Sequence, residues 1–357
     1  MEFKLKFETS ELLKALELVR PGLASREWIE QSTHFAFTRG RVVTFNDEIS
    51  ICHPLSQSEG KEILQGTVNS NEIYNFLKRA PSIVVSIFLE DNMLVIRSGR
   101  SKVRLSFNPE IKLPLDGVVI NDKKRKWIKL PDGFSKALSA ITPICGQDLA
   151  TPILTCVHID IKNGVIEATD NIRIARVTLE RINGNNSVVN LPKILLPRTA
   201  VEELIKYPIQ WVNQGKEDWI HFLTTEKTMF SIRRVNGSFP DISSFLQVDG
   251  HQIRFPDGLD EALGRAEIFS KQKHNPLNEQ VQVRIKEDKI KLHTESESAV
   301  FDETIKASEL LVEKEINFVI HPNFFRQVSG HGAIIGNDRL KMERAGWEYI
   351  VALRALE

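Results

Sequence analysis

A hairpin pattern that occurs three times at one spacing constrains this chain more than any other feature. Alternating apolar residues surround Asn163-Gly164 over residues 157–174. Asn-Gly is the pair that most readily fills the two positive-φ positions of a type I′ turn, and such alternation is typical of half-buried strands. Similar sequences surround Gly40 and Asp288, and the turn residues are 124 apart in both steps (164 − 40 and 288 − 164). The sequence therefore predicts a threefold internal repeat.

Two helices are predicted in each repeat. The first is amphipathic and carries an Ala-Leu pair at positions 15–16, 137–138 and 262–263. The second covers residues 70–79, 198–207 and 322–329, with Asn69 or Ser70 as an N-cap in the first repeat and Pro322 in the first turn of the third. Alternating strands follow over residues 83–107, 210–235 and 334–353.

This order of elements predicts an α+β fold with two helices packed on antiparallel sheets in each domain. Helical and strand periodicity lapses near residues 121–126 and 247–251, where charged and turn residues gather. We therefore expect three domains, at residues 1–121, 122–250 and 251–357. A chain of 357 residues also exceeds the roughly 250–300 residues that one hydrophobic core supports.

Composition predicts a soluble cytoplasmic protein with no membrane partner. Three cysteines without metal-ligand spacing fit a reducing compartment, and the N-terminal residues lack a signal-peptide core. Lys+Arg and Asp+Glu are both 47, so net charge argues neither for nor against nucleic acid.

No motif indicates catalysis, and we expect no catalytic residue, metal or cofactor. Phosphate-binding loops, nucleophile elbows and zinc-binding helices are absent from the sequence. Residues 329–332, Ser-Gly-His-Gly, are interpreted as a helix stop. Asp170 is interpreted as a carboxylate that accepts backbone N–H groups in a turn, and His34 and His158, at equivalent repeat positions, as structural residues.

Cations occur on the solvent side of every predicted helix, although the chain is neutral overall. They are Lys14, Arg20, Lys78, Arg79, Lys136, Arg198, Lys206, Arg265 and Arg326. Two explanations stay open. Exposed Lys and Arg are routine on any one helix; but if all helices line one surface, that surface holds phosphates without reading bases.

In these features the chain resembles the bacterial-type β sliding clamp, the processivity factor of DNA polymerase III. The resemblance covers essentially the whole chain. Its more specific pieces are Arg97-Ser98-Gly99-Arg100-Ser101, Ala168-Thr169-Asp170 with Arg173, Pro197-Arg198, residues 235–241 and residues 349–354. It implies a ring of two chains, a homodimer, in which helices line the hole, sheets form the outside and double-stranded DNA is encircled without sequence specificity.

The resemblance also implies site residues. DNA contacts would come from Arg26, Lys78, Gln147, Arg198 and Lys273. The replicative DNA polymerase, the clamp loader and other proteins with a clamp-binding motif would dock a peptide in a pocket between the second and third domains. Its positions are Ile153, Thr169, Asn171, Ile172, Arg173, Ile174, Pro240, Phe245, Val351, Leu353 and Arg354. At the ring seam, Val103 and Leu105 would meet Ile268 and Phe269 of the second chain.

Two departures from the family pattern concern the pocket. Asn171-Ile172 stands where the family usually has Gly-His, and Val351-Ala352-Leu353 where it has Met-Pro-Met. We therefore expect an apolar pocket with altered peptide specificity. One alternative is a clamp-like regulatory or decoy protein that binds partner peptides without encircling DNA. An enzyme is a third class, which the missing catalytic motifs disfavour.

Overall fold

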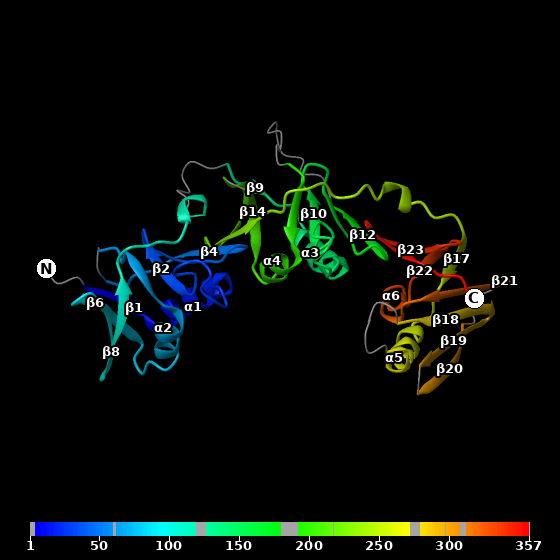
Figure 1. The fold of residues 1–357 in the computed structure, drawn as a ribbon, viewed down its shortest axis with the longest axis horizontal. Coiled ribbons are helices and arrows are strands. Elements are labelled where there is room, and N and C mark those ends of the chain that lie inside the picture. Colours follow the sequence, from blue (N-terminus) through cyan, green and yellow to red (C-terminus); the bar gives the residue numbers. More distant parts are fainter. Residues whose placement is uncertain are drawn as a thin grey trace. The chain divides into compact units, whose positions relative to one another are not determined.

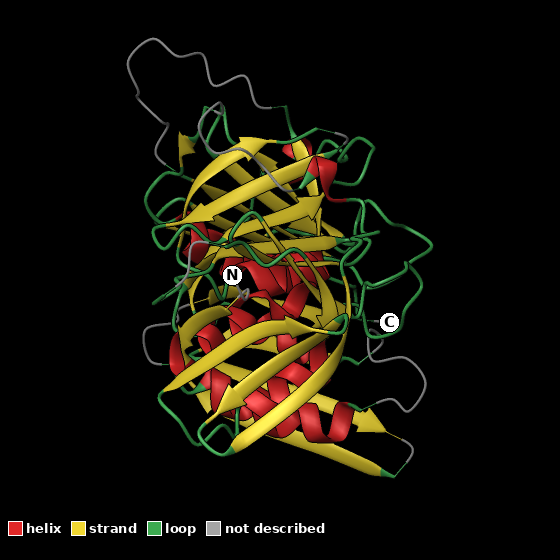
Figure 2. Cartoon of the chain, turned by 90° about the vertical axis from the view of Figure 1, so that its left-hand side faces the viewer, coloured by secondary structure: helices red, strands yellow, loops and turns green. Residues whose placement is uncertain are grey.

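One order of elements occurs three times in the computed structural model, which describes residues 4–59, 62–118, 126–179, 192–216, 218–271, 279–296, 298–307 and 312–356. That order is strand, helix, four strands, helix, three strands (Figure 1). Strands make up much of the chain, and the helices lie against them (Figure 2). Every strand ladder described is antiparallel, which confirms the predicted α+β class.

The first repeat packs its two helices together against the sheet. Its elements are β1 (Lys4–Glu8), α1 (Thr9–Val19), β2 (His34–Thr38), β3 (Arg41–Phe45), β4 (Ile49–Pro54), β5 (Gly66–Asn69), α2 (Ser70–Leu77), β6 (Val84–Glu90), β7 (Met93–Ser98) and β8 (Ser101–Asn108). Helix α1 buries Leu12, Leu16 and Val19 and contacts α2, β3 and β4. The predicted cap of α2 is confirmed, because the Asn69 side chain accepts hydrogen bonds from the backbone of Asn71 and Glu72.

The second repeat has the same order with shorter helices. Its elements are β9 (Ile128–Lys129), α3 (Phe134–Ile141), β10 (Cys156–Asp160), β11 (Val165–Thr169), β12 (Arg173–Thr178), β13 (Ile194–Pro197), α4 (Arg198–Leu204), β14 (Ile209–Gln214), β15 (Trp219–Thr224) and β16 (Met229–Arg233). Helix α4 contacts β13 and buries Ala200, Val201 and Leu204. Both helices predicted for this repeat are therefore present.

The third repeat completes the pattern. Its elements are β17 (His251–Arg254), α5 (Leu259–Ser270), β18 (Val281–Glu287), β19 (Lys289–Ser296), β20 (Ala299–Lys306), β21 (Val312–Ile320), α6 (Pro322–Arg326), β22 (Gly332–Ile335), β23 (Arg339–Arg344) and β24 (Trp347–Ala352). Helix α5 packs on α6 and on β18, β19 and β20. Helix α6 ends at Arg326 with Gln327 as its C-cap, so the helix stops before the predicted residues 329–332, and Gly330 takes φ +72° in the turn that follows.

Contacts group the chain into two compact units that divide the second repeat. The first unit is Met1–Ser139 with Arg181–Asn236, and the second unit is Ala140–Glu180 with Gly237–Glu357. The division into domains at 1–121, 122–250 and 251–357 stays a prediction. Among the described residues, no helix has the length and apolar content needed to cross a membrane.

Each unit joins strands that are far apart in the sequence. In the first unit the strand order is β1-β6-β7-β8-β5-β2-β3-β4-β16-β15-β14-β9. The second unit contains the run β10-β11-β12-β24-β23-β22-β17 and a separate sheet β20-β19-β18-β21. Ile49 of β4 pairs with Ile232 of β16, and Ile174 of β12 pairs with Ile350 of β24. The last strand of one repeat thus pairs with a strand of the preceding repeat.

The predicted type I′ turn at Asn163-Gly164 is wrong, although the hairpin itself is confirmed. The ladder closes at Asp160 and Val165, which leaves a loop of residues 161–164, and Gly164 alone in that loop has positive φ, +70°. The Asp160 carboxylate accepts hydrogen bonds from Asn163 N (3.0 Å) and Asn163 Nδ2 (2.8 Å). This local capping favours the longer loop over the two-residue turn.

A two-residue type I′ turn occurs instead in the first repeat. Arg39 and Gly40, with φ of +51° and +72°, lie between the paired Thr38 and Arg41. Because the second-repeat loop is two residues longer, the ladder pair that corresponds to Ala36 and Val43 is His158 and Glu167. His158 therefore corresponds to Ala36, and its expected equivalence to His34 is corrected.

Candidate partner-binding site

A rigid turn between β11 and β12 forms the base of the candidate site in the second unit. Asp170 Oδ1 accepts hydrogen bonds from Ile172 N (3.0 Å) and Arg173 N (2.9 Å), and its Oδ2 accepts one from Arg173 Nε (2.9 Å). Asn171 has φ +72°, a conformation that asparagine tolerates better than most residues. The interpretation of Asp170 as a structural carboxylate is therefore confirmed.

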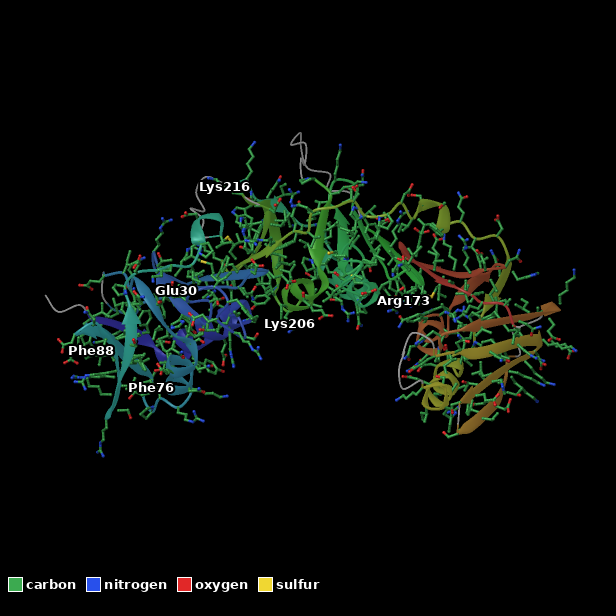
Figure 3. All side chains as sticks on the ribbon, viewed as in Figure 1. Glu30, Phe76, Phe88, Arg173, Lys206 and Lys216 are labelled. Atoms are coloured by element: carbon green, nitrogen blue, oxygen red, sulfur yellow. The ribbon has the colours of Figure 1, made fainter. Side chains whose placement is uncertain are left out.

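Arg173 fastens this turn to its surroundings. Its Nη2 donates to the carbonyl of Pro143 (2.8 Å), and its guanidinium lies 4.1 Å from the ring centroid of Phe324. The Arg173 side chain, labelled in Figure 3, thus bridges the turn, the segment after α3 and α6. We conclude that it positions the turn rather than offering its charge to solvent.

An apolar hollow of about 330 Å³ lies beside the turn. Its lining comes from three segments: the turn with β12, the loop at residues 240–245, and the adjacent strands β23 and β24. The residues are Thr169, Asn171, Ile172, Ile174, Pro240, Asp241, Ile242, Phe245, Asp338, Arg339, Ile350 and Ala352. Ala352 N donates to Ile172 O (2.8 Å), which fixes β24 against the turn. A concave, largely apolar surface with a few polar groups suits an apolar peptide segment.

Charged side chains on the rim of the hollow are held in place by hydrogen bonds within the chain. Arg339 Nε and Nη2 donate to the two carboxylate oxygens of Asp338 at 2.9 and 2.7 Å, and its guanidinium lies 5.4 Å from the ring centroid of Phe245. This hydrogen bonding from Arg339 holds the pKa of Asp338 below its ordinary value. Asp241 accepts a hydrogen bond from Ser243 N (2.9 Å) at the start of a 3₁₀ turn, Ser243–Phe245. Phe245 is 47% exposed, so its ring is available to a ligand.

The structure brings together part of the set that the sequence predicted for this pocket. Six of those residues line the hollow: Thr169, Asn171, Ile172, Ile174, Pro240 and Phe245. Val351 and Leu353 are buried at 0% and 8% exposure, on the opposite face of the last strand and its extension. Ile153 is half-buried and Arg354 is exposed, and neither lines the hollow. Arg173 has the positioning role described above.

Sequence reasoning missed six lining residues, namely Asp241, Ile242, Asp338, Arg339, Ile350 and Ala352. Strand alternation was the signal for two of them. Because successive side chains face opposite sides of a sheet, the register that pairs Ile174 with Ile350 puts Ile350 and Ala352 on the hollow side. Asp338 precedes β23 and Arg339 begins it, and no local pattern marks them as neighbours of residues 169–174.

A buried polar network lies next to the turn, on β10, β11 and β12. His158 Nδ1 is 2.8 Å from Glu167 Oε2, and Arg176 Nε donates to Glu167 Oε1 at 2.6 Å. Burial raises the pKa of Glu167, but the hydrogen bonds and charges of His158 and Arg176 outweigh it and leave that pKa below its ordinary value. The His158 ring stacks on Phe239 with centroids 4.8 Å apart, which anchors the segment that leads to Pro240.

The predicted DNA-contacting residues are distributed over both units. Arg26 and Lys78 are exposed in the first unit, and Gln147 is exposed in the second. Arg198, the first residue of α4, donates to Glu202 Oε1 at 2.7 Å. Lys273 lies outside the described residues. None of these four described side chains lines the hollow beside residues 169–174.

Ion pairs balance many of the helix-borne cations. Arg265 pairs with Glu303 (2.6 Å), Arg326 with Asp260 (2.9 Å), and Lys206, labelled in Figure 3, with Glu203 (2.7 Å). Lys78 and Lys136 form no ion pair with any described residue. The helices therefore combine both signs of charge, which supports the routine explanation for most of their cations.

The predicted seam residues lie on β8 of the first unit and on α5 of the second unit. Val103 is half-buried and Leu105 is 5% exposed on β8, whereas Ile268 is 62% exposed on α5. Phe269 stacks on Phe301 of β20 with centroids 5.4 Å apart. Residues 101–106 of β8 pair with β7 on one side, and β20 is the first strand of its sheet. Within the described part of the chain, both strands thus present backbone groups without a ladder partner.

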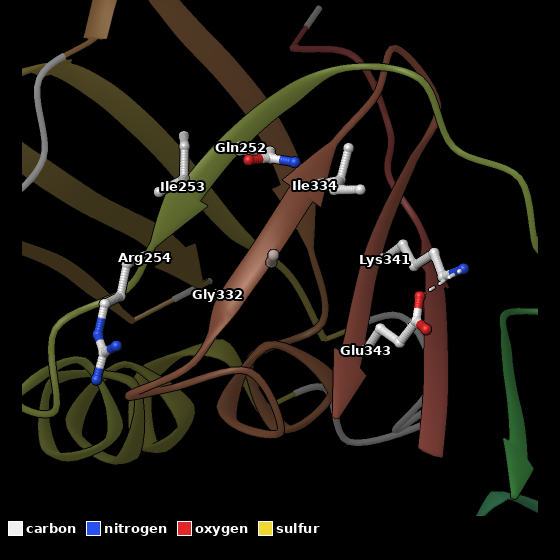
Figure 4. Close-up of a pocket in the computed structure, with 8 residues that line it drawn as sticks. Gln252, Ile253, Arg254, Gly332, Ile334, Lys341 and Glu343 are labelled. Atoms are coloured by element: carbon white, nitrogen blue, oxygen red, sulfur yellow. Dashed lines mark ion pairs between the residues drawn. The ribbon is translucent and has the colours of Figure 1, made fainter. Parts of the chain in front are cut away.

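A second hollow of about 410 Å³ lies over β17, β22 and β23 of the second unit. Figure 4 shows its residues, including Gln252, Ile334 and the ion pair of Lys341 with Glu343 (3.3 Å). Lys341 also contacts Glu348 at 2.8 Å, and no residue predicted for a site lines this hollow. We regard it as the polar outer surface of a sheet.

Comparison with known proteins defines the class of fold. No protein-family model matches the chain, and no curated protein sequence does. Solved structures match over its full length, and the fold is that of the β-subunit sliding clamps of DNA polymerase III. The expected resemblance is therefore confirmed at the level of the fold.

Three of these structures illustrate the likeness. The DNA polymerase III subunit β of Pseudomonas aeruginosa is 18% identical, with 99% of this chain and 100% of that chain covered and a TM-score of 0.84. The DNA polymerase sliding clamp of Bacillus subtilis is 17% identical, with 100% of both chains covered and a TM-score of 0.82. The DNA polymerase III β subunit of Thermotoga maritima is 17% identical, with 99% and 100% covered and a TM-score of 0.79.

Proposed function

We propose that this chain is a sliding clamp, a non-enzymatic cytoplasmic protein that encircles duplex DNA and tethers the replicative DNA polymerase to it. The observation that carries the proposal is the full-length likeness to sliding-clamp structures, with TM-scores of 0.79 to 0.84. No cluster of His, Cys, Asp or Glu suited to a metal ion occurs among the described residues. The proposal requires no catalytic chemistry.

DNA would be held through phosphates by Arg26, Lys78, Gln147, Arg198 and Lys273. Arg26, Lys78 and Gln147 are exposed and so accessible to a duplex. Arg198 shares its charge with Glu202, which reduces its pull on a phosphate. Such contacts are independent of sequence and weaken with salt, whereas closure of a ring prevents escape whatever the affinity.

Partner proteins would dock a short peptide in the hollow beside residues 169–174. Ile172, Ile174, Pro240, Phe245 and Ile350 offer apolar surface, and Asn171 and Arg339 offer polar groups at its rim. The polymerase, the clamp loader and other proteins with a clamp-binding motif would compete for it. Competition follows because one hollow of about 330 Å³ holds one peptide at a time.

The ring would be a homodimer in which β8 of one chain meets β20 of the other. The backbone groups of residues 101–106 and of β20 that have no described ladder partner would pair across the seam. Val103, Leu105, Ile268 and Phe269 would supply the apolar contacts. We expect Ile268→Glu to give monomers, and the mass of the particle in solution checks this.

Retention on circular DNA tests the proposal directly. The protein is first measured by small-angle scattering calibrated for mass, where a ring predicts twice 40.6 kDa and a hollow centre. It is then loaded by its clamp loader on a nicked circular duplex and passed over a sizing column in high salt. We expect it to stay with the circle and to leave after the circle is linearised. A compact monomer, or equal loss from both DNAs, would contradict encirclement.

The alternative is a clamp-like regulatory protein that binds partner peptides without encircling DNA. The ion pairs of Arg198, Lys206, Arg265 and Arg326 favour it, because they lower the positive charge available to a duplex. Tight binding of a polymerase-derived peptide, combined with no retention on circular DNA, would support this alternative over the clamp.

A further inference from the structure

One tryptophan of the first unit projects almost fully into solvent. Trp28 is 85% exposed, whereas the other four of the five tryptophans are buried or half-buried. An indole normally contributes most when it is buried, so an isolated exposed one is a candidate contact for a ligand. Trp28 is not among the site residues predicted from the sequence.

The loop that carries Trp28 is held in place. Ala24 N donates to Ser32 O, and Trp28 N donates to Arg26 O, both at 3.0 Å. Gln31 is only 4% exposed. Its side chain donates to Glu110 O (2.9 Å) and accepts from Lys112 N (2.8 Å). Ile29 packs against the core of the unit. Trp28 is therefore presented on a fixed support rather than on a loose chain.

A hollow of about 700 Å³ lies beside Trp28. It is lined by Leu23, Ala24, Ser25, Arg26, Trp28, Ile29, Ser32, Asn46, Asp47 and Glu48. Ser32 is 1% exposed, and its Oγ is buried without a hydrogen-bond partner among the described residues. Because that oxygen is buried, a ligand in the hollow does not reach it, and the accessible polar side chains of the lining include Arg26, Asp47 and Glu48.

The hollow offers one cation, Arg26, for a phosphate and one carboxylate, Glu48, for a polar ring. Arg26 forms no ion pair within the described ranges, while Asp47 is paired with Arg233 at 2.8 Å. Glu30, labelled in Figure 3, is paired with Lys112 at 2.6 Å. Glu48 accepts a hydrogen bond from Thr199 and lines the hollow, where its carboxylate can also accept from an exocyclic amine such as cytosine N4.

We propose that this hollow binds an unpaired nucleotide of single-stranded DNA, with its base stacked on Trp28 and an adjacent phosphate on Arg26. Aromatic stacking combined with a nearby cation is how proteins hold single strands without duplex geometry. Glu48 would accept a hydrogen bond from cytosine N4 at the edge of the base and so favour cytosine over thymine. The inference rests on the proposed function for its setting, since a clamp on primed DNA works beside unpaired template.

The test uses the full chain and two 5′-labelled single strands of twelve nucleotides, oligodeoxycytidine (dC12) and oligothymidine (dT12). Strands of this length can bind the hollow without a closed ring. Binding is followed by anisotropy of the label and by quenching of tryptophan fluorescence. We expect Trp28→Ala to weaken dC12 binding by roughly 5- to 100-fold, the range that loss of one stacked base produces. Trp28→Phe should keep most of the affinity and lose the quenching, which locates the base at this residue.

Matched variants and probes sharpen the result. Ile83→Ala removes another large apolar side chain of the same unit, 83% exposed, and should leave dC12 affinity unchanged. Glu48→Gln should erase the preference for dC12 over dT12. Free dCMP and rC12 separate a single strand of DNA from a mononucleotide or RNA, and only weak binding of both is expected.

Three results would overturn the inference. They are unchanged dC12 affinity in Trp28→Ala, quenching that persists in Trp28→Phe, and tighter binding of rC12 or of a partner peptide than of dC12. Retention on a nicked circular duplex is measured with the same samples. Retention without dC12 binding removes this inference alone, and dC12 binding without retention removes the clamp alone.

Discussion

Two turns at equivalent repeat positions have the same frame and very different surfaces. In the first unit the Asn46 side chain accepts from Glu48 N (2.9 Å) and Ile49 N (2.6 Å). In the second unit the Asp170 carboxylate accepts from Ile172 N and Arg173 N, and 170 − 46 is the repeat distance of 124. One turn presents Asp47 and Glu48 to its hollow, and the other presents Asn171 and Ile172.

The comparison separates the origin of a turn from its use. A short polar side chain two and three residues ahead of the N–H groups builds both turns. The neighbouring strand from the next repeat is held alike, because Arg233 N of β16 donates to Glu48 O and Ala352 N of β24 donates to Ile172 O. Function then depends on the side chains at the turn, which are the charged Asp47 and Glu48 in one unit and Asn171 with the apolar Ile172 in the other. The same capping arrangement thus lies beside a hollow with charged lining residues in one unit and a mainly apolar hollow in the other.

The largest expected effect comes from placing a charge at Ile172, the apolar residue of the second turn. Ile172→Asp should weaken binding of a fluorescent clamp-binding peptide by roughly 100-fold or more, because apolar contact is lost and a carboxylate is buried. Ile83→Asp, the same change at an exposed position of the first unit, should leave the affinity unchanged. Near-normal affinity of the Ile172 variant in a folded protein would exclude the hollow as the peptide site.

Removing each capping side chain compares the two frames directly. We expect Asp170→Ala to lower the free energy of unfolding by about 2–4 kcal/mol, because two N–H groups and the Arg173 guanidinium lose a partner whose side chain is 8% exposed. Asn46→Ala, which frees two N–H groups and no charge, should cost about 1–2 kcal/mol. Urea unfolding measures both, and equal losses would show that the tie to Arg173 adds nothing.

Lowering the pH should destabilise the strand before the second turn, β11, and not the strand before the first turn, β3. The ladder position of Glu167 is occupied by apolar Val43 in the first repeat. Because the pKa of folded Glu167 lies below its ordinary value of 4.5, its ionised form stabilises the fold above that pH, and the stabilisation is lost as pH falls through the lowered pKa.

The difference in unfolding free energy between the unchanged chain and Glu167→Gln should therefore be constant near neutral pH. It should shrink once the pH is below about 4.5, the ordinary pKa of the group. Val43→Ala provides the control, since its cost should not change with pH in this range. A pH-independent difference for Glu167→Gln would mean that His158 and Arg176 do not hold the carboxylate ionised.

The smallest effect concerns the backbone of the second turn. Asn171 has φ +72°, and none of residues 46–48 in the first turn has positive φ. Asn171→Gly should change the unfolding free energy by no more than about 0.5 kcal/mol, because glycine adopts this conformation without strain. Asp47→Gly should lower the unfolding free energy by about 1 kcal/mol, because glycine gives the unfolded chain more conformational freedom and relieves no strain in the folded one. Equal costs of the two substitutions would mean that both turns have the same conformation.

Much of the fold was predictable because each repeat states the same pattern. Three independent copies of helix periodicity, strand alternation and turn residues agree, so an error in one copy is outweighed by the others. The Asn163-Gly164 turn shows the limit. Pair preference predicted two positive-φ residues, but the Asp160 side chain bonds to Asn163 and the loop became longer. A capping bond three residues away outweighed the intrinsic preference of the pair.

The candidate site was predictable where its residues are consecutive, and less so where strands from another repeat complete it. Residues 169–174 form one turn and one strand, and the motif there identified them. Asp338, Arg339, Ile350 and Ala352 join only through the pairing of β12 with β24 and of β24 with β23. A change of one residue in that register would exchange Ile350 for Val351 on the hollow side, and nothing local in the sequence fixes it.

The unpaired strand edges at β8 and β20 would matter for the proposed homodimer before its two chains meet. A single chain presents both edges among its described residues, and Val300 on β20 is 60% exposed. Such edges are templates for fibrous self-association, against which Lys102, Arg104, Asp302 and Lys306 act as charged gatekeepers. On the proposed homodimer, chains that have not assembled would therefore be removed by the cell's quality control, so the amount of the protein would be set by assembly as well as by synthesis.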